Sequence, residues 1–353
     1  MIYVNGRFLL QVPTGVNRFA YELCRTMARL GEPFVLCVPH GRIHPGYDLR
    51  GLCYETWGVG RSHGWEQVSL PLWFSRQKGP KVLVSLTGLG PVWGSRKVMT
   101  IHDLAFLVAP QWYARSYVCL YKWLTPLCAA TSRRVLTVSR SSQGEIVRRL
   151  RLRPEKVEVV YNAVADVFME KAGEAVGAGA EKPAPCPGKY VLAVSSIDPR
   201  KNFHTLIEAF AHVSDPSVRL YVVGGQNRIY AATVGDLLRH DVAGRVEWLG
   251  RVSDVRLRQL YAHALCLVYP SLYEGFGLPP LEAMACGAPV VVSDIPPLRE
   301  VCGDAALYVD PHNAVDIAEK INLLAADPSL RAAFAGRGAK RWPHFSWTES
   351  ARK

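Results

Sequence analysis

The chain has 353 residues, of which 49% are hydrophobic and 20% charged, and this composition excludes a globally disordered protein. At roughly 100–200 residues per domain, the length predicts two domains. The 42 Lys and Arg residues outnumber the 30 Asp and Glu residues, giving a net charge of +12 that favours an anionic partner: a nucleotide-sugar, an anionic membrane surface or nucleic acid.

In the first half of the chain, short β-branched runs alternate with helical patterns, as expected for parallel strands buried on both faces. Strands are predicted at Val35–Val38, Val82–Leu86, Val98–Ile101, Val135–Val138 and Val157–Tyr161. Helices are predicted at Val16–Leu30, Arg115–Ala130 and Ser141–Leu150. This alternation predicts an α/β fold with a doubly wound parallel sheet.

The stretch 170–188 is rich in Pro, Gly and Ala and is predicted to be a linker about which two domains close. After it the alternation restarts. Strands are predicted at Tyr190–Val194, Leu220–Val223, Val246–Leu249, Leu265–Tyr269, Val290–Val292 and Leu307–Val309. Helices are predicted at Phe203–Val213, Val255–Ala262, Pro280–Ala285, Ala314–Ala326 and Leu330–Lys340. The expected site is a cleft between two Rossmann-like domains, at the carboxyl ends of their strands.

The segment from Tyr269 to Ser293 carries the strongest signal for function. Its sequence, Tyr-Pro-Ser-Leu-Tyr-Glu-Gly-Phe-Gly-Leu-Pro-Pro-Leu-Glu-Ala-Met-Ala-Cys-Gly-Ala-Pro-Val-Val-Val-Ser, predicts a strand, a glycine turn and a helix. The helix N-terminus would offer backbone N–H groups to an anion, and Glu274 and Glu282 would stand on either side of it. Considered alone, two glutamates at this place can simply stabilise the helix dipole.

The whole segment resembles the E-x₇-E region of glycosyltransferase family 4, which has the GT-B fold. The resemblance implies that Glu274 contacts the donor sugar and that Glu282 contacts the nucleotide ribose. The backbone around Phe276, Gly277 and Leu278 would then touch the donor sugar and its phosphates. It also implies domains at 1–169 for the acceptor and 189–340 for the donor, with 341–353 starting a helix that crosses back to the first domain.

Two adjacent cations, Arg200 and Lys201, follow the first strand of the second domain. At a helix start they would oppose the dipole unless an anion lay between them; a solvated surface pair is the alternative. The stretch resembles the family's diphosphate-binding loop, and its lysine corresponds to Lys201. Ser195-Ser196 stands where many members have Gly-Arg, so we expect Arg200 to replace that arginine.

Three further candidate sites rest mainly on the resemblance. His102 and Asp103 end a strand, and we expect His102 to hydrogen-bond the sugar or acceptor; Asp103 would bind acceptor or simply cap its loop. Gly15 and Arg18 lie where the first long helix begins, Gly15 for close approach to the donor and Arg18 for the acceptor. Backbone near Val252 would hold the nucleobase.

The resemblance implies retaining transfer of a hexosyl group, mannosyl from GDP-mannose first, from a nucleotide-sugar donor to a saccharide or polyprenyl-linked acceptor. Trp65-Glu66-Gln67 is similar to the bacterial polysaccharide branch of the family. No D-x-D occurs, and we expect neither metal nor cofactor; Lys201, Arg200 and the helix N-terminus would offset the charge of the leaving diphosphate. The alternatives are a GT-B nucleotide-sugar epimerase and a basic nucleic-acid-binding protein, the latter without a recognisable motif. A G-x-S-x-G match at 60–64, expected to be a loop, leaves a hydrolase as a weaker alternative.

The remaining signals concern location. The nine cysteines form no C-x-x-C and are predicted to be buried thiols of a reducing compartment, and no apolar run reaches about 18 residues. We therefore expect a cytoplasmic protein. Aromatic residues across 112–123 and the cations Arg148, Arg149, Arg151 and Arg153 would suit the inner face of an anionic membrane. The alternative is that the aromatic residues are core and the arginines a solvated face.

Overall fold

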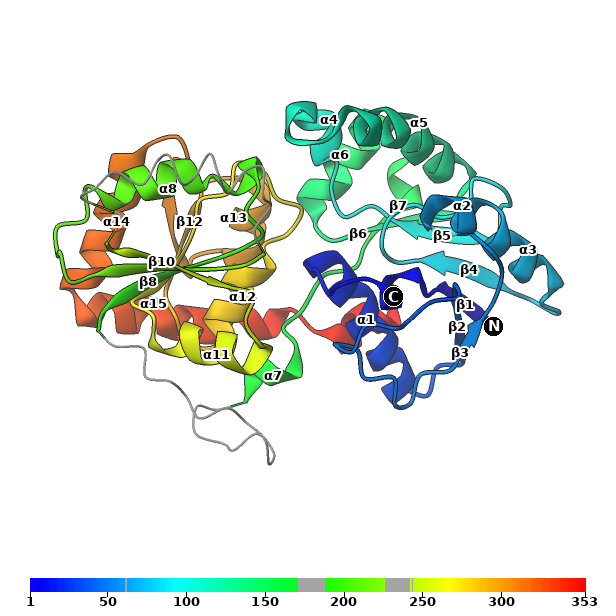
Figure 1. Ribbon diagram of the computed structural model, residues 1–353, viewed down its shortest axis with the longest axis horizontal. Helices are drawn as coiled ribbons and strands as arrows, with labels where there is room; N and C mark the ends of the chain where they lie inside the picture. Colours follow the sequence, from blue (N-terminus) through cyan, green and yellow to red (C-terminus); the bar gives the residue numbers. More distant parts are fainter. Residues whose placement is uncertain (61, 171–187, 226–241, 243) are drawn as a thin grey trace. The chain divides into compact units, whose positions relative to one another are not determined.

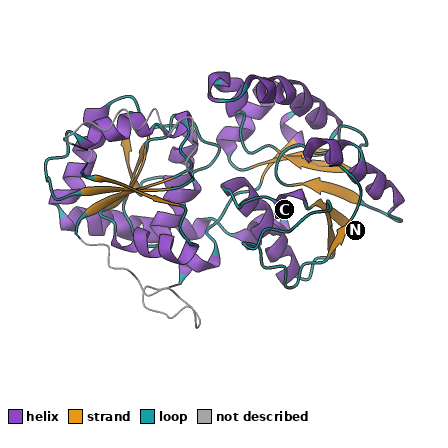
Figure 2. Ribbon diagram, viewed as in Figure 1, coloured by secondary structure: helices purple, strands orange, loops and turns teal. Residues whose placement is uncertain are grey.

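The computed structural model describes residues 1–60, 62–170, 188–225, 242 and 244–353. It divides into two compact units, one of Met1–Asn162 with Ser346–Lys353 and the other of Ala163–Phe345. In the described part of each unit, a parallel sheet lies between helices (Figure 2), which confirms the predicted α/β class.

The first unit contains a seven-stranded parallel sheet of order β3-β2-β1-β4-β5-β6-β7 in its described part. The strands are β1 (Ile2–Asn5), β2 (Phe34–Val38), β3 (Tyr54–Thr56), β4 (Val82–Ser85), β5 (Lys97–Thr100), β6 (Arg134–Thr137) and β7 (Val157–Val159). The helices are α1 (Gly15–Arg29), α2 (Ser62–Gln67), α3 (Ser69–Arg76), α4 (Ala105–Val108), α5 (Arg115–Thr131), α6 (Arg140–Leu150) and α16 (Trp347–Arg352). Successive strand residues face opposite sides of this sheet. Thus Tyr3 and Leu83 pack against α2 and α3, whereas Val4 and Val82 face α1 and α16.

The second unit contains a six-stranded parallel sheet of order β10-β9-β8-β11-β12-β13 in its described part. The strands are β8 (Tyr190–Val194), β9 (Arg219–Val223), β10 (Val246–Gly250), β11 (Cys266–Tyr269), β12 (Val290–Ser293) and β13 (Ala306–Val309). The helices are α7 (Asp166–Met169), α8 (Phe203–Phe210), α11 (Asp254–His263), α12 (Leu278–Ala285), α13 (Pro296–Cys302), α14 (Ala314–Ala326) and α15 (Pro328–Arg341). Helices α8 and α14 pack together on one face, and α11 and α12 lie on the other (Figure 1). The chain order reverses between β8 and β11, which makes their carboxyl ends the expected ligand edge.

The domain limits differ from those predicted. Segment 163–170 belongs to the second unit because Phe168 packs on Tyr261 and Arg258 pairs with Glu170 at 2.6 Å. The chain therefore passes between units at residues 162–163 and again at 345–346, and not across the predicted linker 170–188. Residues 171–187 of that linker lie outside the described residues. At the C-terminus, α16 returns to the first unit, where Trp347 meets Phe19 of α1.

Several elements were not predicted: the strands β1 and β3 and the helices α2, α3, α4, α7 and α13. Strand β3 is short and exposed, and α13 begins with two prolines that obscure its helical pattern. Helix α2 starts at Ser62 within the stretch 60–64 that we expected to be a loop; residue 61 lies outside the described part. Trp65 and Glu66 on this helix are fully buried.

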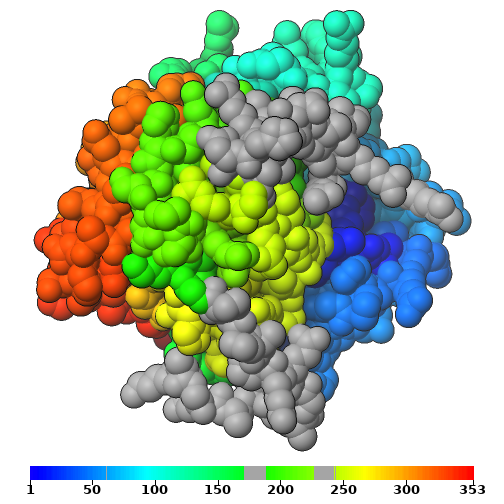
Figure 3. Space-filling view, turned by 60° about the vertical axis from the view of Figure 1, so that its left-hand side comes forward, coloured from blue at the N-terminus to red at the C-terminus, as the bar shows by residue number. Residues whose placement is uncertain are grey.

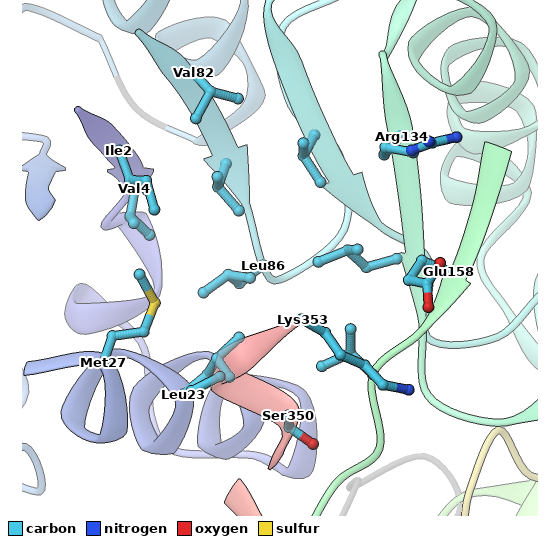
Figure 4. Close-up of a pocket in the computed structure, with 15 residues that line it drawn as sticks. Ile2, Val4, Leu23, Met27, Val82, Leu86, Arg134, Glu158, Ser350 and Lys353 are labelled. Atoms are coloured by element: carbon cyan, nitrogen blue, oxygen red, sulfur yellow. The ribbon is translucent and has the colours of Figure 1, made fainter. Parts of the chain in front are cut away.

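One face of the first sheet is incompletely covered. Between it and helices α1 and α16 lies a cavity of about 530 Å³ (Figure 4). The walls are mostly aliphatic, with Val4, Met27 and Val82 among them, and the polar residues Arg134 and Lys353 lie at one side. A parallel sheet normally has helices over both faces, and α16 is only six residues long.

Helix α5 carries an exposed apolar stripe. Leu120, Trp123 and Leu127 are 42%, 69% and 49% exposed, at a spacing that places them on one helix face. No helix in the described residues is both long enough and apolar enough to span a bilayer. Five of the eight described cysteines are buried, as predicted, whereas Cys53 and Cys119 are exposed.

Candidate active site

The site begins where the second sheet reverses its order, at the carboxyl ends of β8 and β11. Lys201 follows β8 and Glu274 follows β11, and both side chains are buried. The Lys201 ammonium donates to the Glu274 carboxylate at 2.5 Å and to the Tyr269 hydroxyl at 2.8 Å. Two of the predicted residues, 73 positions apart, thus form one buried ion pair.

The electrostatics of this pair follow from burial and mutual attraction. Burial lowers the pKa of Lys201, and the Glu274 carboxylate partly offsets that effect. Burial alone would raise the pKa of Glu274, but the charges of Lys201 and Arg200 outweigh it and leave that pKa below its ordinary value. Burial and the nearby Glu274 charge raise the pKa of Tyr269 well above normal, so its hydroxyl stays protonated at neutral pH. A ligand reaching this place meets a fixed charge pair with a neutral phenol beside it.

The loop from Ser195 to Asn202 is held by local hydrogen bonds. The Asp198 carboxylate accepts from the Ser196 hydroxyl at 2.9 Å and from the Arg200 amide at 3.1 Å. Arg200 and Lys201 lie in a 3₁₀ turn before α8, which begins at Phe203. The predicted clash with the helix dipole is therefore relieved by Asp198 and Glu274 within the protein itself.

Asn202 fastens this loop to its neighbours. Its backbone adopts a left-handed conformation (φ 58°), and its side-chain amide donates to the Pro270 and Pro311 carbonyls at 3.1 and 2.6 Å. The Leu272 amide donates to the Arg200 carbonyl at 2.8 Å. The two loops that carry Lys201 and Glu274 are consequently cross-linked by backbone contacts.

Glu282 lies farther along the same segment, on α12. Its carboxylate is buried and accepts a 3.2 Å hydrogen bond from Tyr261, whose pKa is raised well above normal by burial and by Glu282. Phe276 is buried against Phe345, edge to face at 5.5 Å. Gly277 has φ +118°, and a Cβ there would lie 2.5 Å from Leu298, so only glycine fits.

The anion site predicted at the start of α12 offers fewer donors than expected. Leu278 opens the helix, and Pro279 and Pro280 follow it without backbone N–H groups. The amide of Leu278 and those of the preceding turn are what remains for a phosphate. Val252 lies half-buried between β10 and α11, where its backbone follows the strand end as predicted.

In the first unit, His102 and α1 come together. The His102 ring contacts Phe19 of α1 edge to face at 5.0 Å, and its Nε2 lies 2.9 Å from the Leu86 carbonyl. Burial lowers the pKa of His102, so the ring is neutral at pH 7. Because a carbonyl only accepts, Nε2 carries the proton and Nδ1 is left as an acceptor. Gly15 begins the same helix and is exposed, with open space where a Cβ would lie.

The two expected acceptor residues have local contacts. Asp103 accepts from the Ala105 amide at 3.0 Å, in agreement with the loop-cap alternative. Arg18 is half-buried near Tyr47, whose pKa burial raises to about 12 while the Arg18 charge counteracts that rise.

Sequence reasoning missed several partners. Tyr269 accepts from Lys201 and Tyr261 donates to Glu282, yet each tyrosine occupies a strand or helix position typical of core. Glu66 is fully buried and accepts from Asn5, Arg7 and His63 at 2.8–2.9 Å, which explains structurally the motif around it. The sequence offered one signal for a buried Glu66. This glutamate directly follows Trp65, in a stretch where the pattern of strands and helices is interrupted. Among the described residues no three His, Cys, Asp or Glu side chains group as metal ligands would; independence from metal stays a prediction.

Comparison with known proteins adds to this geometry. Residues 13–166 match "Glycosyltransferase Family 4", and residues 180–341 match "Glycosyl transferases group 1". O-antigen chain mannosyltransferase B of Escherichia coli is 31% identical over 259 residues, which cover 71% of this chain and 67% of that protein. O-antigen chain mannosyltransferase RfbU of Salmonella typhimurium is 34% identical over 219 residues, covering 61% of this chain but only 57% of that one. The crystal structure of WaaG, a glycosyltransferase involved in lipopolysaccharide biosynthesis, superposes with a TM-score of 0.74 at 16% identity, covering 100% and 98% of the two chains, and shares the fold.

Proposed function

Because the chain belongs to the family 4 glycosyltransferases, we propose that it moves a hexosyl group from a nucleotide-sugar to a lipid-linked saccharide or polysaccharide precursor, with retention of configuration. Mannosyl from GDP-mannose is the first donor to test, since two relatives are named as O-antigen chain mannosyltransferases. The observation that carries the proposal is the buried Lys201–Glu274 pair at the reversal point of the second sheet.

Each side of that pair suits one part of a nucleotide-sugar. A carboxylate accepts hydrogen bonds from sugar hydroxyls, so Glu274 would orient the transferred sugar. An ammonium stabilises the charge that grows on a departing diphosphate, and Lys201 has a third N–H beyond those used on Glu274 and Tyr269. Glu282, kept in place by Tyr261, would bind the ribose hydroxyls.

In the first unit, the acceptor would be oriented by hydrogen bonding. The neutral His102 can accept from a hydroxyl through Nδ1. Retention is explained by attack on the face from which the diphosphate leaves, with the phosphate taking the acceptor proton. Arg200 would offset phosphate charge beside Lys201.

We further propose that the first unit rests on an anionic membrane surface. The exposed stripe of Leu120, Trp123 and Leu127 would enter the headgroup region. The exposed cations in the last turn of α6 and just after it, Arg148, Arg149, Arg151 and Arg153, would face anionic lipid. Some aromatic residues of 112–123 pack in the core and others are exposed, as membrane contact requires. Tyr113 and Tyr121 pack against the buried cluster around Phe106, whereas Tyr117 and Trp123 are 37% and 69% exposed.

The test is a panel of nucleotide-sugars measured by calorimetry and by product analysis. GDP-mannose, UDP-glucose and other GDP- and UDP-sugars would be titrated, and a candidate lipid-linked acceptor added. Binding of one donor, with nucleotide release that depends on the acceptor, supports transfer. A donor that is converted to its epimer without an acceptor supports the epimerase alternative, and activity that EDTA abolishes would contradict the proposed independence from metal.

A further inference from the structure

An arginine outside the predicted site lies at the same sheet edge as Lys201. Arg251 follows β10 directly and is exposed. Its guanidinium lies against Gly225: a Cβ on that glycine would be 2.8 Å from Nε and 3.1 Å from Nη2 of Arg251. Glycine at 225 therefore leaves the space that the guanidinium occupies.

The backbone beneath Arg251 is joined to the loop that carries Lys201. Gly224 has φ +152°, and a Cβ there would lie 1.7 Å from the Ser195 carbonyl oxygen, so no side chain fits between β9 and this loop. The Ile197 amide donates to the Gly225 carbonyl at 3.1 Å. Strands β9 and β10 pair directly in parallel, with Val246 opposite Leu220 and Gly250 opposite Val223. Figure 3 shows the surface of the second unit, coloured from green to red along the chain. Arg251 thus belongs to the carboxyl edge at which we place the donor phosphates.

The charge balance of this edge distinguishes Arg251 from its neighbours. Lys201 has Glu274 at 2.5 Å, and Arg200 has Asp198 at 3.9 Å. Arg251 has no ion pair with any described residue. Such a guanidinium, sterically accommodated at a ligand edge, exposed and without a carboxylate partner in the part of the chain that the structure describes, is suited to two parallel hydrogen bonds with phosphate oxygens.

We propose that Arg251 is a further phosphate-binding residue of the donor site, acting on the nucleoside diphosphate. The inference rests on the proposed function. If Arg251 binds the diphosphate, the carboxyl ends of β9 and β10 also take part in donor binding, in addition to those of β8 and β11. Arg251 lies against Gly225, whose carbonyl accepts from the amide of Ile197. The residue before Ile197, Ser196, is exposed and is the position at which many members of the resembled family have an arginine.

The test compares three ligands that share a base but differ in phosphate: GDP, GMP and guanosine, with the uridine series in parallel. Calorimetry on the full chain would be done with wild type, Arg251→Ala and Arg219→Ala. Arg219 is the matched control because it is an exposed arginine at the opposite end of β9. A third variant combines Arg251→Ala with Ser196→Arg.

We expect Arg251→Ala to raise the Kd for GDP about tenfold, or about 1.4 kcal/mol, with less effect on GMP and none on guanosine. Ser196→Arg in the same chain should recover most of that loss, and Arg219→Ala should bind as wild type. An unchanged GDP affinity in Arg251→Ala, or an equal loss with guanosine, would overturn the inference. If wild type binds neither nucleoside diphosphate, the proposed function itself fails, which is a different outcome.

Discussion

The carboxyl edges of the two sheets are built on different principles. In the second unit, neighbouring loops bring opposite charges into one buried pair, Lys201 with Glu274. In the first unit, His102 is neutral and hydrogen-bonded to a backbone carbonyl, and Asp103 caps a local turn. The fixed charges of Lys201 and Glu274 suit an ionic donor, whereas the neutral ring of His102 suits the hydroxyls of a saccharide. The first unit also has a buried charge, Glu66, which is paired with Arg7. The difference therefore supports the proposed division of labour between the units.

The substitution Lys201→Ala is expected to have the largest effect, because it removes the cation of the charged site in the second unit. Turnover should fall by about 10²–10³-fold or more, because an electrostatic stabiliser of the leaving group is lost. The variant also leaves Glu274 buried without its cation, which should cost roughly 3–5 kcal/mol of stability. Turnover and melting temperature would both be measured.

The double variant Lys201→Met with Glu274→Gln separates these effects. Removing both charges should restore much of the melting temperature but none of the turnover. Near-normal turnover of Lys201→Ala with any donor would contradict the role given to the lysine.

The membrane proposal gives the next largest effect. Replacing Arg148, Arg149, Arg151 and Arg153 together by Gln should reduce co-sedimentation with anionic liposomes at low salt by about tenfold or more. Wild type should detach as salt rises and should ignore neutral liposomes. Nucleotide affinity should not change.

A matched control removes four exposed cations from the second unit. These are Lys189, Arg219, Arg299 and Lys340. If both variants lose co-sedimentation equally, net charge alone explains the binding. Equal binding of wild type to neutral and anionic liposomes would contradict the membrane proposal.

The two units also differ in packing, because the first unit has a cavity against its sheet, and filling this cavity tests that difference. A helical segment fused after Lys353, with an apolar face toward Val4 and Met27, should raise the melting temperature by about 3 °C. The reason is that it would bury aliphatic side chains that now line a cavity of about 530 Å³. A segment of equal length with Ser and Glu on that face is the control, and equal melting temperatures would count against this explanation.

The smallest effect concerns His102. Because burial lowers its pKa in the folded state, the unfolded chain binds a proton first as the pH falls through about 6.5. His102 should therefore cost stability between pH 7 and pH 5, and wild type should lose more melting temperature over that range than His102→Gln. Parallel curves for the two proteins would show that His102 does not titrate as described.

Most of the fold could be predicted because buried parallel strands have a distinct composition. Tyr190–Val194 and Ala314–Ala326 were predicted to the residue. The failures have physical causes: β3 is exposed and three residues long, and α2 lies among glycines. The domain limit was missed because it depends on tertiary contacts of Phe168 and Arg258, which no local pattern encodes.

For the site, sequence could supply the residues but not their pairing. Lys201 and Glu274 were each assigned to a different part of the donor, and nothing in their spacing showed that they bind one another. Tyr269 was missed because its ring completes a strand while its hydroxyl serves the site. Arg251 was missed because its position depends on Gly225, which has no side chain and so leaves room for the guanidinium.

The attachment of Glu170 to Arg258 has a practical consequence for engineering. The stretch 171–187 is joined at both ends to the second unit, since α7 and β8 both belong to it. Lengthening a connection whose ends are both fixed in one body costs little free energy, because loop-closure entropy grows only with the logarithm of length. A reporter domain or a protease site placed there would leave the two passages between units unaltered. This stretch is therefore a suitable position at which to insert a label into the enzyme.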